Sequence, residues 1–199
     1  MPSRLILASS SEIRAQLLRQ AGVDFEVKAA RVDEEAIKEA LQAEEAPPRD
    51  IADALAEAKA RKVSGTLPES LVLGCDQILA FDGSILSKPR DQAEALRHLK
   101  MLRGQRHQLM SAAVLYENAK PVWRHVGVVR LLMREASDEW LDAYVARNWR
   151  SIQHSVGGYK LEEEGVRLFT RIDGDHFNVL GLPLLELLSH LVLRGTLAS

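Results

Sequence analysis

The sequence predicts an α/β fold, in which strands and helices alternate along a chain of 199 residues. Short apolar runs, such as residues 5–8 and 71–75, are bounded by serine, glycine or aspartate, as strands commonly are. Longer segments, such as residues 50–65, repeat apolar side chains at helical spacing. Because 46% of the residues are hydrophobic, the chain can fill a sizeable core. We therefore expect one domain over residues 1–199.

Five strands are expected from apolar runs, the last two on either side of the turn at residues 117–121. They cover residues 5–8, 25–27, 71–75, 107–116 and 122–133. Six helices are expected, with boundaries set by capping side chains, helix-ending glycines and Pro183 in a first turn. They cover residues 12–20, 33–43, 50–65, 91–104, 137–147 and 183–195. Residues 44–49 form the most linker-like segment but are too few to establish a domain boundary.

Composition and charge exclude several classes of protein. A formal net charge of −2 gives no electrostatic reason to expect nucleic acid as a partner. The single cysteine, Cys75, allows no intrachain disulfide and no cysteine-based zinc cluster. The apolar start of the chain soon ends at serines, and no segment approaches the roughly 20 apolar residues that span a membrane. We expect a cytoplasmic protein that binds neither nucleic acid nor membranes.

The first segment with recognisable chemistry lies where the first strand meets the first helix. Ser9, Ser10 and Ser11 occupy the predicted helix N-terminus, and Arg14 follows one turn later. Free N–H groups, hydroxyls and the positive end of the helix dipole favour a phosphate or carboxylate there. A serine is also a common N-cap, so an ordinary capping role is the alternative.

Charged residues accompany two other apolar elements. Lys59 shares the apolar face of the helix over 50–65, where a lysine either extends past the core to solvent or faces an anion in a pocket. Asp76 ends a buried strand, and the following apolar hairpin returns to Lys88. The pair Asp76 and Lys88 is either a structural ion pair or part of a site at one end of the sheet.

Two further segments are a glycine-rich turn, Gly157-Gly-Tyr-Lys-Leu-Glu162, and a loop before the last helix, Asn178-Val-Leu-Gly-Leu-Pro183. Together with the earlier segments, their order and spacing resemble the Maf family of nucleoside triphosphate pyrophosphatases over nearly the whole chain. The other matching pieces are Ala8-Ser-Ser-Ser-Glu-Ile-Arg14, Asp33-Glu34, Leu55-Ala-Glu-Ala-Lys-Ala60, Gly74-Cys-Asp76 and Lys88-Pro89. Glu12 stands where the family usually has proline.

The resemblance implies a role for each of these residues. Asp76 is implied as the general base, and a water ordered by a metal would attack the α-phosphorus. The triphosphate would be held by Ser9, Arg14, Lys59 and Lys88. Asp76 with Glu34 or Asp33 would form the carboxylate cluster for Mg²⁺ or Mn²⁺, and we assign Glu34 and Asp76 as the metal ligands.

Three positions indicate which base is recognised. They are Ile13, Gln77 and Glu162, which resemble the 7-methyl-GTP branch of the family more than the dTTP/UTP branch. An ionised Glu162 only accepts hydrogen bonds, which matches the adjacent N–H donors of guanine and favours a positively charged methylated ring. Ile13 stands where that branch usually has tryptophan and does not stack on a base as tryptophan does. A solvated turn carboxylate is the alternative for Glu162.

The resemblance also implies the architecture and partners. The fold class is α/β and is similar to inosine triphosphate pyrophosphatases, with a long mixed twisted sheet flanked by helices and two lobes around a central cleft. A homodimer is implied as well. The leading hypothesis is hydrolysis of a modified nucleotide such as 7-methyl-GTP, which prevents its incorporation into nucleic acids. The alternatives are a broad-specificity house-cleaning pyrophosphatase and a nucleotide-binding regulator of cell division or septum formation.

Overall fold

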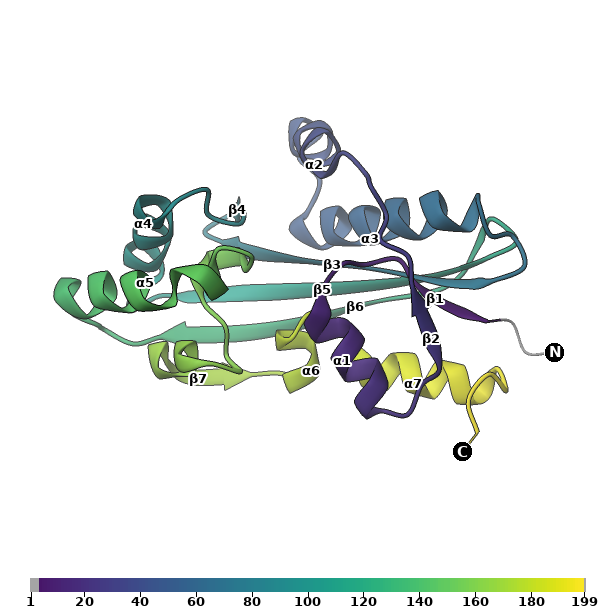
Figure 1. Ribbon diagram of the computed structural model, residues 1–199. Coiled ribbons are helices and arrows are strands. Elements are labelled where there is room, and N and C mark those ends of the chain that lie inside the picture. The colour runs from purple at the N-terminus through teal and green to yellow at the C-terminus, as the bar shows by residue number, and fades with distance from the viewer. Residues whose placement is uncertain (1–3, 199) are drawn as a thin grey trace. The chain divides into compact units, whose positions relative to one another are not determined.

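A computed structural model describes residues 4–198 and contains a seven-stranded sheet (Figure 1). Its order is β2-β1-β3-β5-β6-β7, and β4 pairs with β3. The strands are β1 Leu5–Leu7, β2 Phe25–Val27, β3 Leu71–Phe81, β4 Ser84–Leu86, β5 Arg106–Glu117, β6 Lys120–Met133 and β7 Phe169–Asp173. β1 is parallel to β2 and β3, whereas β3 with β4 and β6 with β7 are antiparallel. The predicted mixed α/β sheet is confirmed.

Helices connect and flank these strands. They are α1 Glu12–Gln20, α2 Glu34–Ala43, α3 Pro48–Ser64, α4 Gln92–Leu102, α5 Asp138–Ile152, α6 His176–Val179 and α7 Leu184–Leu193, with 3-10 turns at Val156–Gly158 and Glu164–Leu168. The six predicted helices are present, β4 and the distal half of β3 form the predicted hairpin that returns to Lys88, and the structure adds α6, β7 and the 3-10 turns. β3 continues to Phe81 instead of ending at Cys75 because its distal half pairs with β4. Over residues 4–198, no helix combines the length and apolar character needed to cross a membrane.

The chain divides into two compact units, each assembled from separate segments. Among the described residues, unit 1 contains 4–77, 110–127 and 175–198, and unit 2 contains 78–109 and 128–174. The linker-like segment 44–49 joins α2 to α3 inside unit 1 and marks no boundary. The divisions fall inside β3, β5 and β6, where one continuous strand contributes to both units. The expected single domain and the expected central cleft stay predictions.

In unit 1, the alternating side chains of β3 serve two helical layers. Leu71, Leu73 and Cys75 belong to a core cluster with residues of α1 and α7. Gly74 has the opposite orientation and lies against the backbone of α3 at Ala56 and Ala60. Figure 1 shows α3 on one side of β1 and β3, with α1 and α7 on the other. The same alternation therefore directs Asp76 toward the α3 layer.

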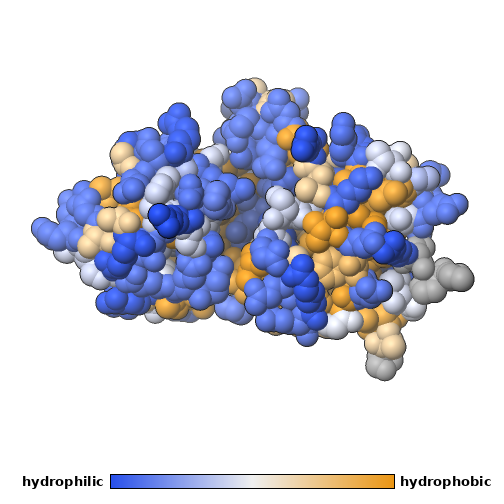
Figure 2. Space-filling model, in the orientation of Figure 1, coloured by the Kyte–Doolittle hydropathy of each residue, from blue (hydrophilic) through white to orange (hydrophobic). Residues whose placement is uncertain are grey.

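Hydrophobic residues also reach the surface of unit 1. Figure 2 shows orange side chains among the blue ones over the region of α1 and β2. Val27, in the edge strand β2, is 50% exposed. Because apolar atoms commonly make up much of the surface of a folded protein, we assign this region no role.

Unit 2 has an aromatic core built around a buried histidine. α4 packs against α5, while His107 of β5 lies beside Tyr159 and Phe169, with ring centroids 5.7 and 5.8 Å away. His107 Nε2 forms a 2.8 Å hydrogen bond with the Tyr159 hydroxyl. Burial lowers the pKa of His107 to about 4, because a charged imidazole would lose its hydration.

We predict that the free energy of unfolding decreases as the pH falls from 6.5 to about 4. The pKa of His107 is lower in the folded protein than in the unfolded chain, so the unfolded chain binds the proton first. The loss from this side chain is about 3 kcal/mol once the pH is below both values. Denaturant unfolding across this pH range measures it. The variant His107→Gln, which keeps a polar side chain but does not titrate, should show a flatter dependence; an unchanged dependence would exclude His107 as its source.

We predict that Gly74→Ala destabilises the protein by about 3 kcal/mol, because a side chain at this position overpacks the contact between β3 and α3. An added Cβ would lie 2.6 Å from the Ala60 nitrogen and closer still to the Ala56 carbonyl oxygen. Gly65→Ala is the matched control, since the nearest atom to its added Cβ is 3.5 Å away. Chemical denaturation should separate the two variants. Equal stabilities would contradict the proposed close packing.

Candidate active site

A buried lysine joins the two predicted metal ligands. Lys59 Nζ lies 2.6 Å from Asp76 Oδ1 and 2.9 Å from Glu34 Oε1. The side chains of Lys59 and Asp76 are only 10% and 9% exposed. Asp76 thus forms an ion pair with Lys59 of unit 1. Of the two alternatives for Lys59, the structure shows a side chain that faces carboxylates and does not extend to solvent.

Local structure explains why these three side chains meet. Asp76 follows Gly74 by two residues on the same face of β3, and Gly74 allows α3 to approach closely. Glu34 opens α2, whereas Asp33 is its N-cap and accepts a hydrogen bond from the Ala36 backbone N–H at 3.1 Å. The structure thus gives the two acidic residues different contacts, a helix cap for Asp33 and Lys59 for Glu34.

Arg14 is a buried connector between three segments of unit 1. Its Nε donates to the Gly181 carbonyl oxygen at 2.7 Å, and Nη1 donates to Ser9 Oγ at 3.1 Å and to the Cys75 carbonyl oxygen at 3.0 Å. These bonds tie the loop before α1 to the residue preceding Asp76 and to the loop before α7. Gly181 adopts a φ of +94°, and an added Cβ would lie 3.2 Å from the guanidinium.

These contacts restrict what the α1 terminus can offer a ligand. Arg14 is 8% exposed, and its Nε and Nη1 are committed to the protein. Ser9 is also buried, and its Oγ accepts from Arg14 and from the Ser11 backbone N–H at 3.3 Å. Ser11 is the N-cap residue of α1, although its side chain makes no capping hydrogen bond. A phosphate role for Ser9 and Arg14 stays a prediction, and the structure adds a connecting role that the sequence did not reveal.

Gln77 links β3 to β5 and α6. Its Nε2 lies 3.0 Å from Ser111 Oγ and from the carbonyl oxygens of Asn178 and Val179. Ser111 Oγ donates to the same Asn178 carbonyl at 2.6 Å. The amide nitrogen is therefore engaged within unit 1, which leaves the amide oxygen as the atom of Gln77 that could contact a base.

Asn178 contacts Gln77, although the sequence analysis gave it no individual role. It is 4% exposed, and its backbone N–H and Nδ2 each donate to Asp175 Oδ2 at 3.1 Å. A Cβ at Gly127 would lie 2.6 Å from Asn178 Nδ2 and closer to its Oδ1. The motif Asn178–Pro183 was the only sequence signal for this residue. Its neighbours Gly127 and Ser111 lie on strands distant in sequence, so the sequence did not reveal these contacts.

Lys88 and Glu162 lie in unit 2, and both are exposed. Lys88 follows β4, and Glu162 follows the glycine turn. Gly157 and Gly158 have φ values of +74° and +71°, a backbone region that favours glycine. Ile13, the third specificity position, is half-buried on α1 of unit 1.

The glycine turn is followed by three glutamates with different surroundings. Glu163 accepts from Ser151 at 2.7 Å, and Glu164 accepts from Arg147 at 2.6 and 2.8 Å. The exposed Glu162 precedes this pair of anchored side chains. The contact of Glu162 with a base stays a prediction.

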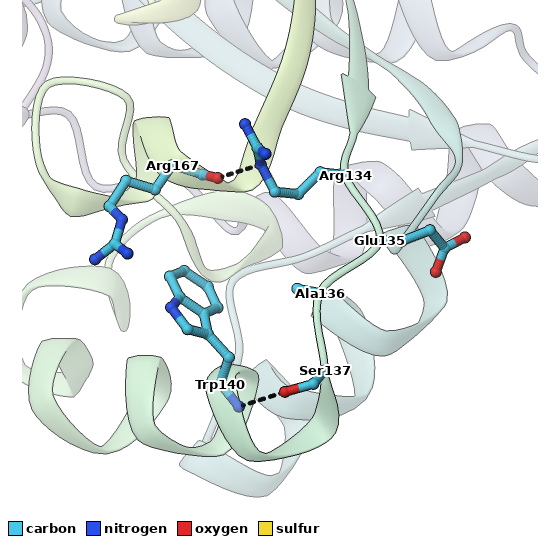
Figure 3. A pocket seen from close by; sticks show the side chains of 6 residues that line it. All are labelled: Arg134, Glu135, Ala136, Ser137, Trp140 and Arg167. Carbon is cyan, nitrogen blue, oxygen red and sulfur yellow. Dashed lines mark hydrogen bonds between the residues drawn. The ribbon is translucent and has the colours of Figure 1, made fainter.

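Unit 2 contains a pocket of about 460 Å³ lined by Arg134, Glu135, Ala136, Ser137, Trp140 and Arg167. Figure 3 shows the Arg134 side chain directed toward the Arg167 carbonyl oxygen, to which Nε donates at 2.8 Å. The Arg167 guanidinium carbon lies 5.4 Å from the Trp140 ring centroid, and Nη1 donates to Glu164 at 3.1 Å. The predicted site residues do not line this pocket, whose arginines bind groups of the protein itself.

Comparison with known proteins identifies relatives over nearly the full chain. A family model for Maf-like proteins matches residues 4–193. The nucleoside triphosphate pyrophosphatase of Ruegeria sp. (strain TM1040) is 68% identical over 195 residues, 98% of both chains. That of Roseobacter denitrificans (strain ATCC 33942 / OCh 114) is 66% identical over 197 residues, 99% of both chains. The 7-methyl-GTP pyrophosphatase of Rhizobium meliloti (strain 1021) is 47% identical over 191 residues, 96% of both chains.

We predict that Arg14→Lys lowers the free energy of unfolding by about 3 kcal/mol, because one ammonium group does not reproduce the hydrogen bonds of the planar guanidinium. Arg19→Lys is the control on the same helix, since Arg19 is exposed and pairs with Glu12. This control should change stability by less than about 0.5 kcal/mol. Urea denaturation measures both variants. If Arg14→Lys is as stable as the control, Arg14 is not a structural connector.

Proposed function

The chain belongs to the Maf family, and on this premise we propose that it hydrolyses a nucleoside triphosphate to a nucleoside monophosphate and pyrophosphate. The names of its relatives support this activity. The structural observation that carries the proposal is the contact of the buried Lys59 with both Asp76 and Glu34. In this cluster Asp76 can accept a proton, and the neighbouring Lys59 ammonium can bind an anionic substrate.

In the proposed reaction, a water molecule attacks the α-phosphorus of the substrate. Asp76 accepts a proton from the attacking water as the new P–O bond forms. The bond from the α-phosphorus to the bridging oxygen breaks, and that oxygen leaves with pyrophosphate. A positioned general base contributes about 10²–10⁴-fold to such a step.

The cationic side chains would balance the charge that develops on the leaving group. Lys59 is positioned by the sheet and α3, and Lys88 is the second proposed phosphate ligand. Ser9 and the N-terminal N–H groups of α1 would add hydrogen-bond donors. Arg14 supports this end of the site through Ser9 and the Cys75 carbonyl, with Nη2 as its remaining donor group.

The carboxylates of Glu34 and Asp76 fit a hard divalent cation, Mg²⁺ or Mn²⁺, because they converge on one point, the Lys59 ammonium. Within residues 4–198, no group of three or more His, Cys, Asp or Glu side chains is arranged to hold a metal ion. Two carboxylates suit an ion that substrate phosphates and water also coordinate. When bound, such an ion supplies Lewis-acid stabilisation of phosphate oxygens.

For the base, we propose a preference for 7-methyl-GTP. Glu162 would accept hydrogen bonds from the N–H groups of guanine, and its charge would favour the methylated ring. The exposed position of Glu162 after the glycine turn supports this assignment, because its carboxylate is accessible to a ligand. Ile13 offers an apolar contact without aromatic stacking, and Gln77 offers its amide oxygen. A homodimer and a cytoplasmic location, both expected from the sequence, stay predictions.

We predict that Asp76→Asn reduces turnover at least 10²-fold, because an amide does not accept the proton from water. The measurement is pyrophosphate release with Mg²⁺ or Mn²⁺ from a panel of 7-methyl-GTP, GTP, UTP, dTTP and CTP. Asp82→Asn is the control, since exposed Asp82 has a φ of +48°, a conformation that asparagine tolerates. Circular dichroism verifies the fold of each variant. Near-normal turnover in folded Asp76→Asn would remove Asp76 from the base role.

We predict that Glu162→Gln shifts the ranking of the same panel from 7-methyl-GTP toward pyrimidine triphosphates. A neutral amide both donates and accepts, and it no longer attracts a cationic ring. Asp142→Asn removes an exposed carboxylate elsewhere in unit 2 and should leave the ranking as in the wild type. If Glu162→Gln also leaves the ranking unchanged, Glu162 does not read the base.

A further inference from the structure

We propose that Lys59 acts as a resident cation that excludes a divalent metal ion from Glu34 and Asp76 until a triphosphate draws the ammonium away. The metal ion would then bind together with the nucleotide and only weakly before it. This inference rests on the proposed function and concerns the order in which the same site is filled.

The Lys59 ammonium contacts both carboxylates that are proposed to bind the metal ion. Its Nζ contacts both carboxylates, at 2.6 Å from Asp76 Oδ1 and 2.9 Å from Glu34 Oε1. These are distances of charge-assisted hydrogen bonds, in which the ammonium donates and the carboxylates accept. The two oxygens that would hold a metal ion are therefore already bound to a cation.

A metal ion at the same oxygens would compete with the ammonium group for them. Mg²⁺ binds oxygen at about 2.0–2.1 Å, which is shorter than either contact made by Lys59. Because the ion carries two charges, its repulsion from the ammonium at a given distance is twice that between two unit charges. Burial strengthens this repulsion, since the Lys59 side chain is only 10% exposed. Simultaneous occupation of the two carboxylate oxygens by both cations is disfavoured.

The substrate can remove this obstacle without moving the protein backbone. Gly74 fixes α3 against β3, so the anchor of Lys59 stays in place while its four-carbon side chain can rotate. A triphosphate offers oxygen acceptors that replace the carboxylates as partners of the ammonium. Glu34, which is 36% exposed, and Asp76 would then be available to the metal ion that the phosphates bring.

The test measures the affinity of the full chain for Mn²⁺ in the absence of nucleotide. Electron paramagnetic resonance detects the bound and free ion. We expect Lys59→Gln to bind Mn²⁺ at least tenfold more tightly than the wild type. Lys59→Arg keeps the charge and should exclude Mn²⁺ as the wild type does. Lys62→Gln removes an exposed lysine from the same helix and should match the wild type. Equal affinities of the wild type and a folded Lys59→Gln would overturn the proposal.

A second measurement needs no variant and covers the case in which Lys59→Gln does not fold. Equilibrium dialysis of the wild type compares protein-bound Mn²⁺ with a non-hydrolysable triphosphate analogue, with a nucleoside monophosphate and without nucleotide. We expect uptake only with the triphosphate. Strong uptake without nucleotide would overturn the proposal.

The panel assay separates this inference from the proposed function. Pyrophosphate release by the wild type together with tight Mn²⁺ binding without nucleotide would refute the role of Lys59 and leave the function standing. Absence of turnover would refute the function, whereas tighter Mn²⁺ binding by Lys59→Gln would still support competition between the two cations.

Discussion

The close approach of α3 to β3 is the constraint on which the candidate site depends. Gly74 presents no side chain, so the backbone of α3 at Ala56 and Ala60 can lie directly against the strand. This contact brings Lys59 within hydrogen-bond distance of Asp76. Because burying an unpaired charge is costly, the ion pair is stable only where the two elements keep this separation. The contact between α3 and β3 therefore both packs the core and positions the charged residues of the candidate site.

A second set of contacts holds the site from the opposite face of the sheet. Arg14 reaches the loop at Gly181, and Gln77 reaches Asn178 and Val179 of α6. Each makes hydrogen bonds mainly to backbone oxygens, which do not change with side-chain identity. Residues expected to bind substrate thus also keep distant segments together. Such double use limits which substitutions this region tolerates, since a change affects stability as well as binding.

Most helices and strands could be located from the sequence, because their positions depend on residues close together in the chain. Apolar spacing, capping side chains and helix-ending glycines predicted every α-helix of the described residues except α6, and most of the strands. The distal half of β3 and β4 form the hairpin expected between Asp76 and Lys88, whereas β7 was not predicted, because pairing with β6 supplies its stability. Only the family resemblance implied a division into two parts. Local signals did not show where it falls, since it passes through continuous strands.

By itself, the sequence determined the fold class and the order of the motifs that resemble the Maf family. Tertiary structure decided which partners these residues have. It paired Lys59 with both Asp76 and Glu34, gave Asp33 a capping role, and placed Arg14 inside unit 1. Neither spacing nor residue type specifies such contacts, because they depend on which strands become neighbours and on which face each side chain emerges.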